Sequence, residues 1–175
     1  QAGERRRTLQ MPLNAAKVLA GFHIPAQLHP DHAVLEMANE VLFGGRSSRV
    51  YRRLVTGEEL ASEVSGWVAP FAEPGLLEVM VTAKREASPD AVEGALFEEV
   101  EKLAQGGPTP EEMARARVRL EAELLRELAS FGGRAEALGH FETVGGDFGQ
   151  LFSSVERWRA PVADDVRRVV RGYLV

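Results

Sequence analysis

The sequence predicts an α+β domain in which helices pack on one face of an antiparallel-rich sheet. Segments with strand character are confined to the first half of the 175 residues, and everything after Glu86 has helical periodicity. Strands and helices do not alternate beyond the start of the chain, which argues against a doubly wound parallel sheet. The length suits one domain with a sizeable core, so we expect residues 1–175 to form a single domain.

Polar and apolar residues, together with turn signals, define the expected strands. The segments with strand character are residues 7–11, 17–24, 61–69 and 76–84. The first alternates polar and apolar side chains, as a half-buried strand does. Pro25 ends the second. Residues 73–75, Glu-Pro-Gly, form a turn signal, so the last two strands are predicted to pair in an antiparallel hairpin.

Two helices are expected between the second strand and the hairpin. Apolar residues between Val34 and Leu42 recur at helical spacing, which predicts a helix over residues 31–43 with Asp31 or a neighbour as its cap. Gly44-Gly45 is predicted to end this helix. Ser47-Ser48 is predicted to cap a shorter helix that runs to Arg53 or Leu54.

The second half of the chain is predicted to be helical throughout. The expected helices cover residues 89–105, 109–130, 134–144, 148–158 and 161–173. Thr109 and Glu112 have the spacing of a capping box. The glycine pairs that start at residues 106, 132 and 145 are each predicted to separate two helices. The chain stops after Leu174-Val175, where we expect a final strand to be truncated.

Composition excludes several classes of function. A net charge of −5 argues against a nucleic-acid partner, and the short basic runs 5–7 and 52–53 are interpreted as solvated surface charge. The absence of cysteine excludes thiol nucleophiles, disulfides and cysteine metal sites. No apolar run reaches the roughly 18 residues of a membrane-spanning helix. No signal peptide is visible, and both the bacterial cytoplasm and the periplasm stay open as locations.

No constellation of catalytic or metal-binding residues stands out. His29, His32 and Glu36 have a spacing that could suggest a zinc site, but His29 precedes the expected helix, and His32 is interpreted as facing solvent. His23 lies among apolar residues and is interpreted as a core or edge histidine. The zinc-peptidase motifs H-x-x-E-H and H-E-x-x-H are absent, as is the G-x-S-x-G motif of serine hydrolases.

One segment resembles a known family. Residues 29–54 resemble the C-terminal domain of the pitrilysin/insulinase-type zinc metallopeptidases, of the mitochondrial-processing-peptidase kind. The matching residues are Leu35, Leu42, Gly44, Gly45, Ser47, Ser48, Arg49, Tyr51 and Leu54. Residues 109–117 look like the start of another helix of that family, and residues 160–169 look like its closing helix, with Pro161 in place of a threonine.

The resemblance implies that the chemistry lies elsewhere. Family members hold two homologous halves that close around a peptide, and the N-terminal half binds zinc. In many members the C-terminal half lends an arginine and a tyrosine to the substrate carbonyl, and those positions fall on Val55 and Ser62. Neither side chain can replace them. We therefore expect no catalytic, metal or substrate-binding residue in this chain, and zinc only in the missing N-terminal half or a partner subunit.

Two functions are compatible with this resemblance. The first is a non-catalytic C-terminal domain of a zinc metallopeptidase, which forms the wall of a peptide-binding chamber together with a zinc-bearing half. The alternative is a structural subunit of the same fold with no peptidase role. Whether the parent is an enzyme is left open, although this chain alone should be inactive. The expected partners are the zinc-bearing half, a peptide substrate and, for the isolated domain, a second copy of itself.

Overall fold

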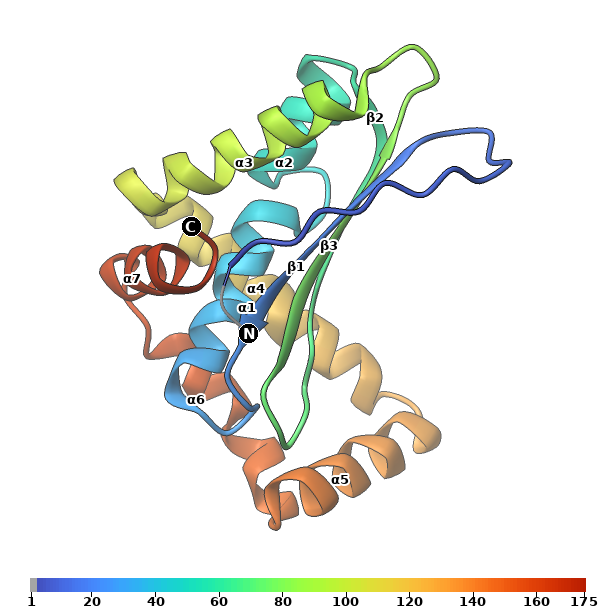
Figure 1. The fold of residues 1–175 in the computed structure, drawn as a ribbon. Coiled ribbons are helices and arrows are strands. Elements are labelled where there is room, and N and C mark those ends of the chain that lie inside the picture. The colour runs from blue at the N-terminus through green and yellow to red at the C-terminus, as the bar shows by residue number, and fades with distance from the viewer. Residues whose placement is uncertain (1–2) are drawn as a thin grey trace.

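A two-layer α+β fold is found in the computed structural model, which describes residues 3–175 (Figure 1). One layer is a three-stranded sheet and the other consists of helices. In chain order the elements are β1 (Lys17–Ile24), α1 (Pro30–Phe43), α2 (Arg49–Tyr51), the π-helical segment η1 (Arg52–Gly57), β2 (Ala61–Val68), β3 (Gly75–Ala83), α3 (Pro89–Gly106), α4 (Pro110–Leu128), α5 (Phe131–Gly145), the 3-10 helix η2 (Phe148–Ser153), α6 (Ser154–Arg159) and α7 (Ala163–Tyr173).

The sheet has the strand order β1-β3-β2, and both pairings are antiparallel. Side chains of successive strand residues point to opposite faces. On β3, Leu77, Val79 and Val81 are fully buried, whereas Glu78 between them is exposed. Helices α1, α3 and α7 contact the sheet, and in Figure 1 they lie on one side of it. The predicted α+β class, with helices on one face, is therefore confirmed.

The main core lies between the sheet and α1, which is the most deeply buried helix. Eleven of its 14 residues are buried. Its N-terminus is capped by His29 and its C-terminus ends at Gly44, as the glycine pair predicted. Because α1 is surrounded by β2, α4, α6 and α7, it is apolar on nearly all sides rather than along one stripe.

A small second cluster of buried residues lies outside the main core. It consists of Ala137, Phe141 and Leu151, with Leu124, Leu128 and Leu138 packed around it. These residues come from the end of α4, from α5 and from η2. Figure 1 shows α5 at the lower end of the molecule, away from the bundle of α1, α3 and α7. We call this part, residues 124–153, the satellite lobe.

The prediction of a strand over residues 7–11 is wrong. Residues 4–13 are exposed and have no regular structure, with Leu9 79% and Met11 62% exposed. The alternation of polar and apolar residues marks a strand only where another strand pairs with it. The segment makes no ladder with β1 in the part of the chain that the structure describes; Arg6 instead pairs with Glu93 of α3 at 2.7 Å.

Two later helix boundaries also differ from the prediction. Gly132-Gly133 does not separate helices but lies in the first turn of α5. The break comes earlier, where Ser130 caps α5 by accepting a hydrogen bond from the Gly133 nitrogen at 3.0 Å. The single helix expected over residues 148–158 is the 3-10 helix η2 followed by the short α6. The short helix predicted after Ser47-Ser48 is the three-residue α2 followed by the π-helical η1, and the Ser48 hydroxyl donates to the Gly45 carbonyl at 2.7 Å instead of capping α2. The helices predicted over residues 31–43, 89–105, 109–130 and 161–173 and the capping box of Thr109 and Glu112 are confirmed.

None of the helices in the described part of the chain combines the length and the apolar character needed to cross a membrane.

Candidate functional site

The residues with zinc-like spacing are each engaged in structural contacts. His29 caps α1, where its Nδ1 accepts a hydrogen bond from the Asp31 backbone nitrogen at 3.1 Å. His32 was expected to face solvent, and this is wrong: it is 2% exposed. Its Nε2 lies 3.1 Å from the carbonyl oxygen of Ala69. The loop after β2 covers His32, which local helical periodicity could not indicate.

The carboxylate of Glu36 faces α6 instead of a metal position. Its Oε2 accepts a hydrogen bond from the indole nitrogen of Trp158 at 2.6 Å, and its Oε1 lies 3.8 Å from Nδ1 of His32. Within residues 3–175 no group of three or more His, Asp or Glu residues could hold a metal ion. His32 and Glu36 therefore connect α1 to the loop after β2 and to α6.

The remaining two histidines lie apart from this group. His23 is exposed on the outer face of β1, which is an edge strand, so the edge interpretation applies and the core interpretation does not. His140 belongs to α5, where its Nε2 lies 2.8 Å from Oε1 of Gln27. The structure thus brings His32 and Glu36 together and leaves His23 and His140 separate.

The two positions that the family resemblance singled out lie on different elements. Val55 is half-buried in η1 and packs against the main core. Ser62 is exposed near the start of β2, where its hydroxyl donates to the Thr82 carbonyl at 3.3 Å. A valine side chain offers no hydrogen-bond donor. The Ser62 hydroxyl is short and already faces its own sheet, so we still predict that neither residue binds substrate.

Two arginines of the matched segment attach it to the helical layer. Arg49 donates to both carboxylate oxygens of Glu112, at 2.8 and 2.7 Å, and to the carbonyl of Gly107 at 2.9 Å. The bidentate geometry fixes the orientation of the guanidinium group. Glu112 also closes the capping box of α4. The arginine therefore joins α2 to the turn between α3 and α4, a structural role that the sequence alone did not indicate.

Arg53 is not the solvated surface charge that the sequence suggested. Its side chain is 20% exposed and forms ion pairs with Glu58 at 2.7 Å, Glu98 at 2.6 Å and Glu99 at 3.2 Å. Glu98 and Glu99 belong to α3, so Arg53 anchors η1 to that helix. Arg52 and the run 5–7 are exposed, as expected.

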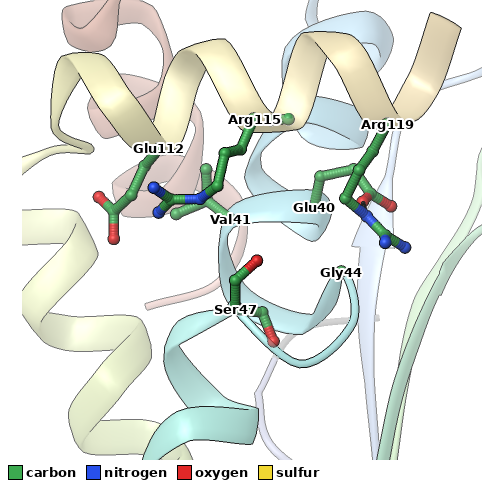
Figure 2. A pocket seen from close by; sticks show the side chains of 9 residues that line it. Glu40, Val41, Gly44, Ser47, Glu112, Arg115 and Arg119 are labelled. Carbon is green, nitrogen blue, oxygen red and sulfur yellow. Dashed lines mark hydrogen bonds and ion pairs between the residues drawn. The ribbon is translucent and has the colours of Figure 1, made fainter. Parts of the chain in front are cut away.

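A small polar crevice lies beneath α4, and Figure 2 shows it from close by. It is formed by the C-terminal end of α1, the Gly44–Ser48 turn and residues 112–119 of α4. Its volume of about 10 Å³ accommodates no more than one water molecule. Glu40 and Arg119 meet at its edge, with Nε donating to Oε2 at 2.6 Å. The crevice is too small for a substrate.

Glu40 and Asp31, both on α1, have opposite electrostatic surroundings. Burial raises the pKa of Glu40 above its ordinary value, although the hydrogen bond from Arg119 acts in the other direction. For Asp31 the hydrogen bond from Arg168 at 2.6 Å lowers the pKa, and a second hydrogen bond from the Tyr173 hydroxyl at 2.8 Å adds to this effect. Both carboxylates hold α1 to another helix.

Within residues 3–175, the outer face of the sheet lies opposite α1, α3 and α7, and no helix covers it (Figure 1). It carries exposed apolar side chains, with Leu19 70% and Trp67 48% exposed. Phe71, in the loop after β2, extends the apolar area and packs edge-to-face on Trp67 with ring centroids 5.8 Å apart. Acidic and basic side chains lie among them, namely Lys17, Glu63 and Glu78. Exposed apolar residues gathered on one face are typical of an interaction surface.

Known proteins resemble this chain in sequence and in fold. The sequence profile of the family described as the peptidase M16 inactive domain matches residues 1–120. An uncharacterized zinc protease of Streptomyces coelicolor is 26% identical over 159 residues, which cover 91% of this chain and 34% of that protein. The chain thus spans about a third of the length of this relative.

Two solved structures resemble most of the chain. The inactive peptidase domain of a candidate zinc protease of Bordetella parapertussis has a TM-score of 0.82 at 27% identity, covering 95% of this chain and 88% of that one. A candidate zinc protease of Bordetella pertussis has a TM-score of 0.78 at 29% identity, and the match covers 91% of this chain and 87% of that one.

Proposed function

The chain belongs to the peptidase M16 inactive-domain family, and we propose that it forms one wall of a peptide-binding chamber whose zinc-bearing half is a separate domain or subunit. The observation that carries this proposal is the outer face of the sheet. Leu19, Trp67 and Phe71 are exposed there, and a face without a helical cover is suited to contact with another molecule.

The side chains present support a proposal in which the zinc chemistry lies outside this chain. Zinc-dependent peptide hydrolysis needs several protein ligands that fix the metal ion and an open coordination position for water. The residues described here hold no such group. The zinc-bearing half would supply the activated water and the sheet edge on which an extended peptide lies. The present domain would exclude solvent and limit the space above that peptide.

A first experiment asks whether the isolated chain has chemistry of its own. The purified 175-residue chain is incubated with zinc, desalted and analysed for bound metal, and its cleavage of fluorescent casein is measured. We expect less than stoichiometric zinc and no cleavage above background. Stoichiometric zinc or robust cleavage by this chain alone would refute the proposal.

A second experiment locates the wall in the parent protein. A photo-reactive residue at Leu19 should cross-link to a casein peptide, whereas the same residue at Val118 on α4 should not. The two positions are matched, since Leu19 is 70% and Val118 is 66% exposed. Cross-linking from Val118 alone would show that the substrate contacts the helical layer, and the proposed orientation would be wrong.

The structural-subunit alternative is favoured by one specific observation. Val55 is half-buried and Ser62 faces its own sheet, so neither position offers the substrate contacts that the resemblance associates with catalytic assemblies. The upstream sequence of the parent decides between the two functions. An intact H-x-x-E-H motif there, with casein hydrolysis by the parent, rules the alternative out, and its absence favours it.

A further inference from the structure

The outer face of the sheet is organised in rows that run across the three strands. Each row holds one residue from β1, β3 and β2 in that order. Three complete rows are Lys17, Thr82 and Glu63, then Leu19, Met80 and Ser65, then Gly21, Glu78 and Trp67, and the pair His23 and Leu76 follows them at the end of β1. We propose that the chain, when separated from its zinc-bearing half, forms a weak twofold dimer in which these faces stack. This goes beyond the proposed function, because it concerns the partner of the free domain.

The orientation of the dimer follows from symmetry. A homodimer interface of this kind is isologous, so each contact occurs twice. Two stacked sheets keep their strands roughly aligned. If the twofold axis runs along the strands, every row lies over the same row of the second copy, while β1 lies over β2 and β3 lies over β3.

This orientation brings opposite charges together. Lys17 on β1 comes to lie over Glu63 of the second copy, and Glu63 over its Lys17. Within one copy the two residues are on opposite sides of β3, separated by two strand spacings of together about 9.6 Å. Neither forms an ion pair with another residue in the described part of the chain, residues 3–175. The two pairs would therefore give the dimer a fixed register.

The same orientation places the large side chain of Trp67 opposite a glycine of the second copy. Trp67, 48% exposed, comes to lie over Gly21 of the second copy. Gly21 is exposed and has no side chain, and a Cβ atom there would meet only a methyl group of Leu76, at 3.7 Å, so the position is open towards the second copy. Leu19 and Met80 lie in the adjacent row, where the apolar contact continues.

The alternative orientation is less complementary. With the twofold axis perpendicular to the strands, β1 lies over β1, and Lys17 comes over His23 at the other end of the second copy's strand. Trp67 then comes over the row of Ser65 rather than over Gly21. The charge pair and the match of tryptophan to glycine both disappear, so we place the axis along the strands.

The contact area indicates a weak dimer. Three strands of about eight residues cover roughly 400 Å², which is half of the about 800 Å² per partner found in stable complexes. Glu78 lies on the central strand, so its carboxylates approach each other near the axis and oppose association. We therefore expect dimers at concentrations on the order of 100 μM rather than in the nanomolar range.

Sedimentation equilibrium of the 175-residue chain tests the arrangement, with samples from about 10 μM to about 500 μM. The substitutions Lys17→Glu and Glu63→Lys should each weaken the dimer by about 5-fold or more, because each places like charges together. The double variant Lys17→Glu/Glu63→Lys re-forms both pairs with reversed charges and should regain the original dissociation constant. Gly21→Leu should weaken the dimer by filling the space for Trp67.

Controls separate an interface effect from a folding effect. Val118→Glu changes an exposed apolar residue of α4 and should leave the dissociation constant unchanged, and circular dichroism should show the same melting temperature for all variants. A chain that stays monomeric over the whole range, or a double variant as weak as the single ones, would overturn the proposal. Either result is independent of the zinc and cleavage assays, so the proposed function can stand or fall separately.

Discussion

At the scale of single residues, α1 carries two acidic side chains whose folded-state pKa values shift in opposite directions. Asp31 is stabilised as an anion by Arg168 and Tyr173, so its pKa is lowered. Glu40 lies deeper, and burial raises its pKa despite the hydrogen bond from Arg119. A lowered folded-state pKa adds stability above the unfolded-state pKa, and a raised one removes stability there.

The pH dependence of two substitutions should therefore differ in sign. Asp31→Asn should lower the free energy of unfolding by about 1 kcal/mol at pH 7, and this loss should shrink as the pH falls towards about 4. Glu40→Gln should gain stability relative to the native chain as the pH rises from about 4 to about 7. Urea unfolding followed by circular dichroism at several pH values measures both. Parallel pH curves for the two variants would contradict the assignment.

Residue-level predictability was limited by contacts between distant segments. The sequence pattern predicted the capping box of Thr109 and Glu112, because both partners lie within one helical turn. It did not predict that His32 is buried, because Ala69, which covers it, is 37 residues away. The absence of catalytic residues rests on motif comparison and stays a prediction until activity is measured.

At the scale of elements, the packing of β2 on α1 depends on a glycine. Gly66 is on the inner face of β2, and Asn39 of α1 donates to its carbonyl at 3.4 Å. A Cβ atom at Gly66 would overlap the Asn39 side-chain oxygen and lie 2.6 Å from a ring carbon of Phe43. The helix and strand can approach this closely only without a side chain there.

A matched pair of glycine substitutions tests this contact. Gly66→Ala should destabilise the fold by about 1–3 kcal/mol, because the helix or the strand must move. Gly139→Ala, in α5 with no atom within 4 Å of the added carbon, should instead stabilise by about 0.5–1 kcal/mol through helix propensity. Thermal unfolding of both variants measures the difference. A neutral Gly66→Ala variant would show that β2 and α1 pack less closely than described.

Element prediction succeeded where a segment finds its partner nearby in the chain. Strands β2 and β3 were predicted from their alternation and the turn between them, and they pair. Residues 7–11 have the same alternation, yet no strand pairs with them within residues 3–175. The alternation of polar and apolar residues shows only that a segment can form a strand. Whether it does so depends on whether the tertiary structure places another strand beside it.

At the scale of the whole molecule, the two tryptophans report on the two layers. Trp158, on α6 in the helical layer, is 9% exposed and donates a hydrogen bond to Glu36 of α1. Trp67, on the outer face of the sheet, is 48% exposed. Iodide should therefore quench part of the fluorescence of the dilute native chain. The variant Trp67→Phe should retain only emission that iodide barely quenches. Efficient quenching in that variant would contradict the described burial of Trp158.

The fold class, with helices on one face of an antiparallel sheet, was predictable, because it follows from the order of elements and their apolar periodicity. The connections between distant elements were not. Arg49 and Glu112 are 63 residues apart, and nothing in the local sequence of either residue indicates the other. Such pairs become visible only when the helices are placed relative to one another.

The satellite lobe should unfold more easily than the rest of the molecule. Only three residues form its buried centre, Ala137, Phe141 and Leu151, whereas the main core has many fully buried side chains. A unit with so little apolar burial opens at a smaller free energy than the rest. Backbone amides of α5 should thus exchange hydrogen with solvent when the satellite lobe alone unfolds. Backbone amides of α1 should exchange only when the whole chain unfolds. A protease in dilute solution would nick this lobe first and leave the sheet layer intact.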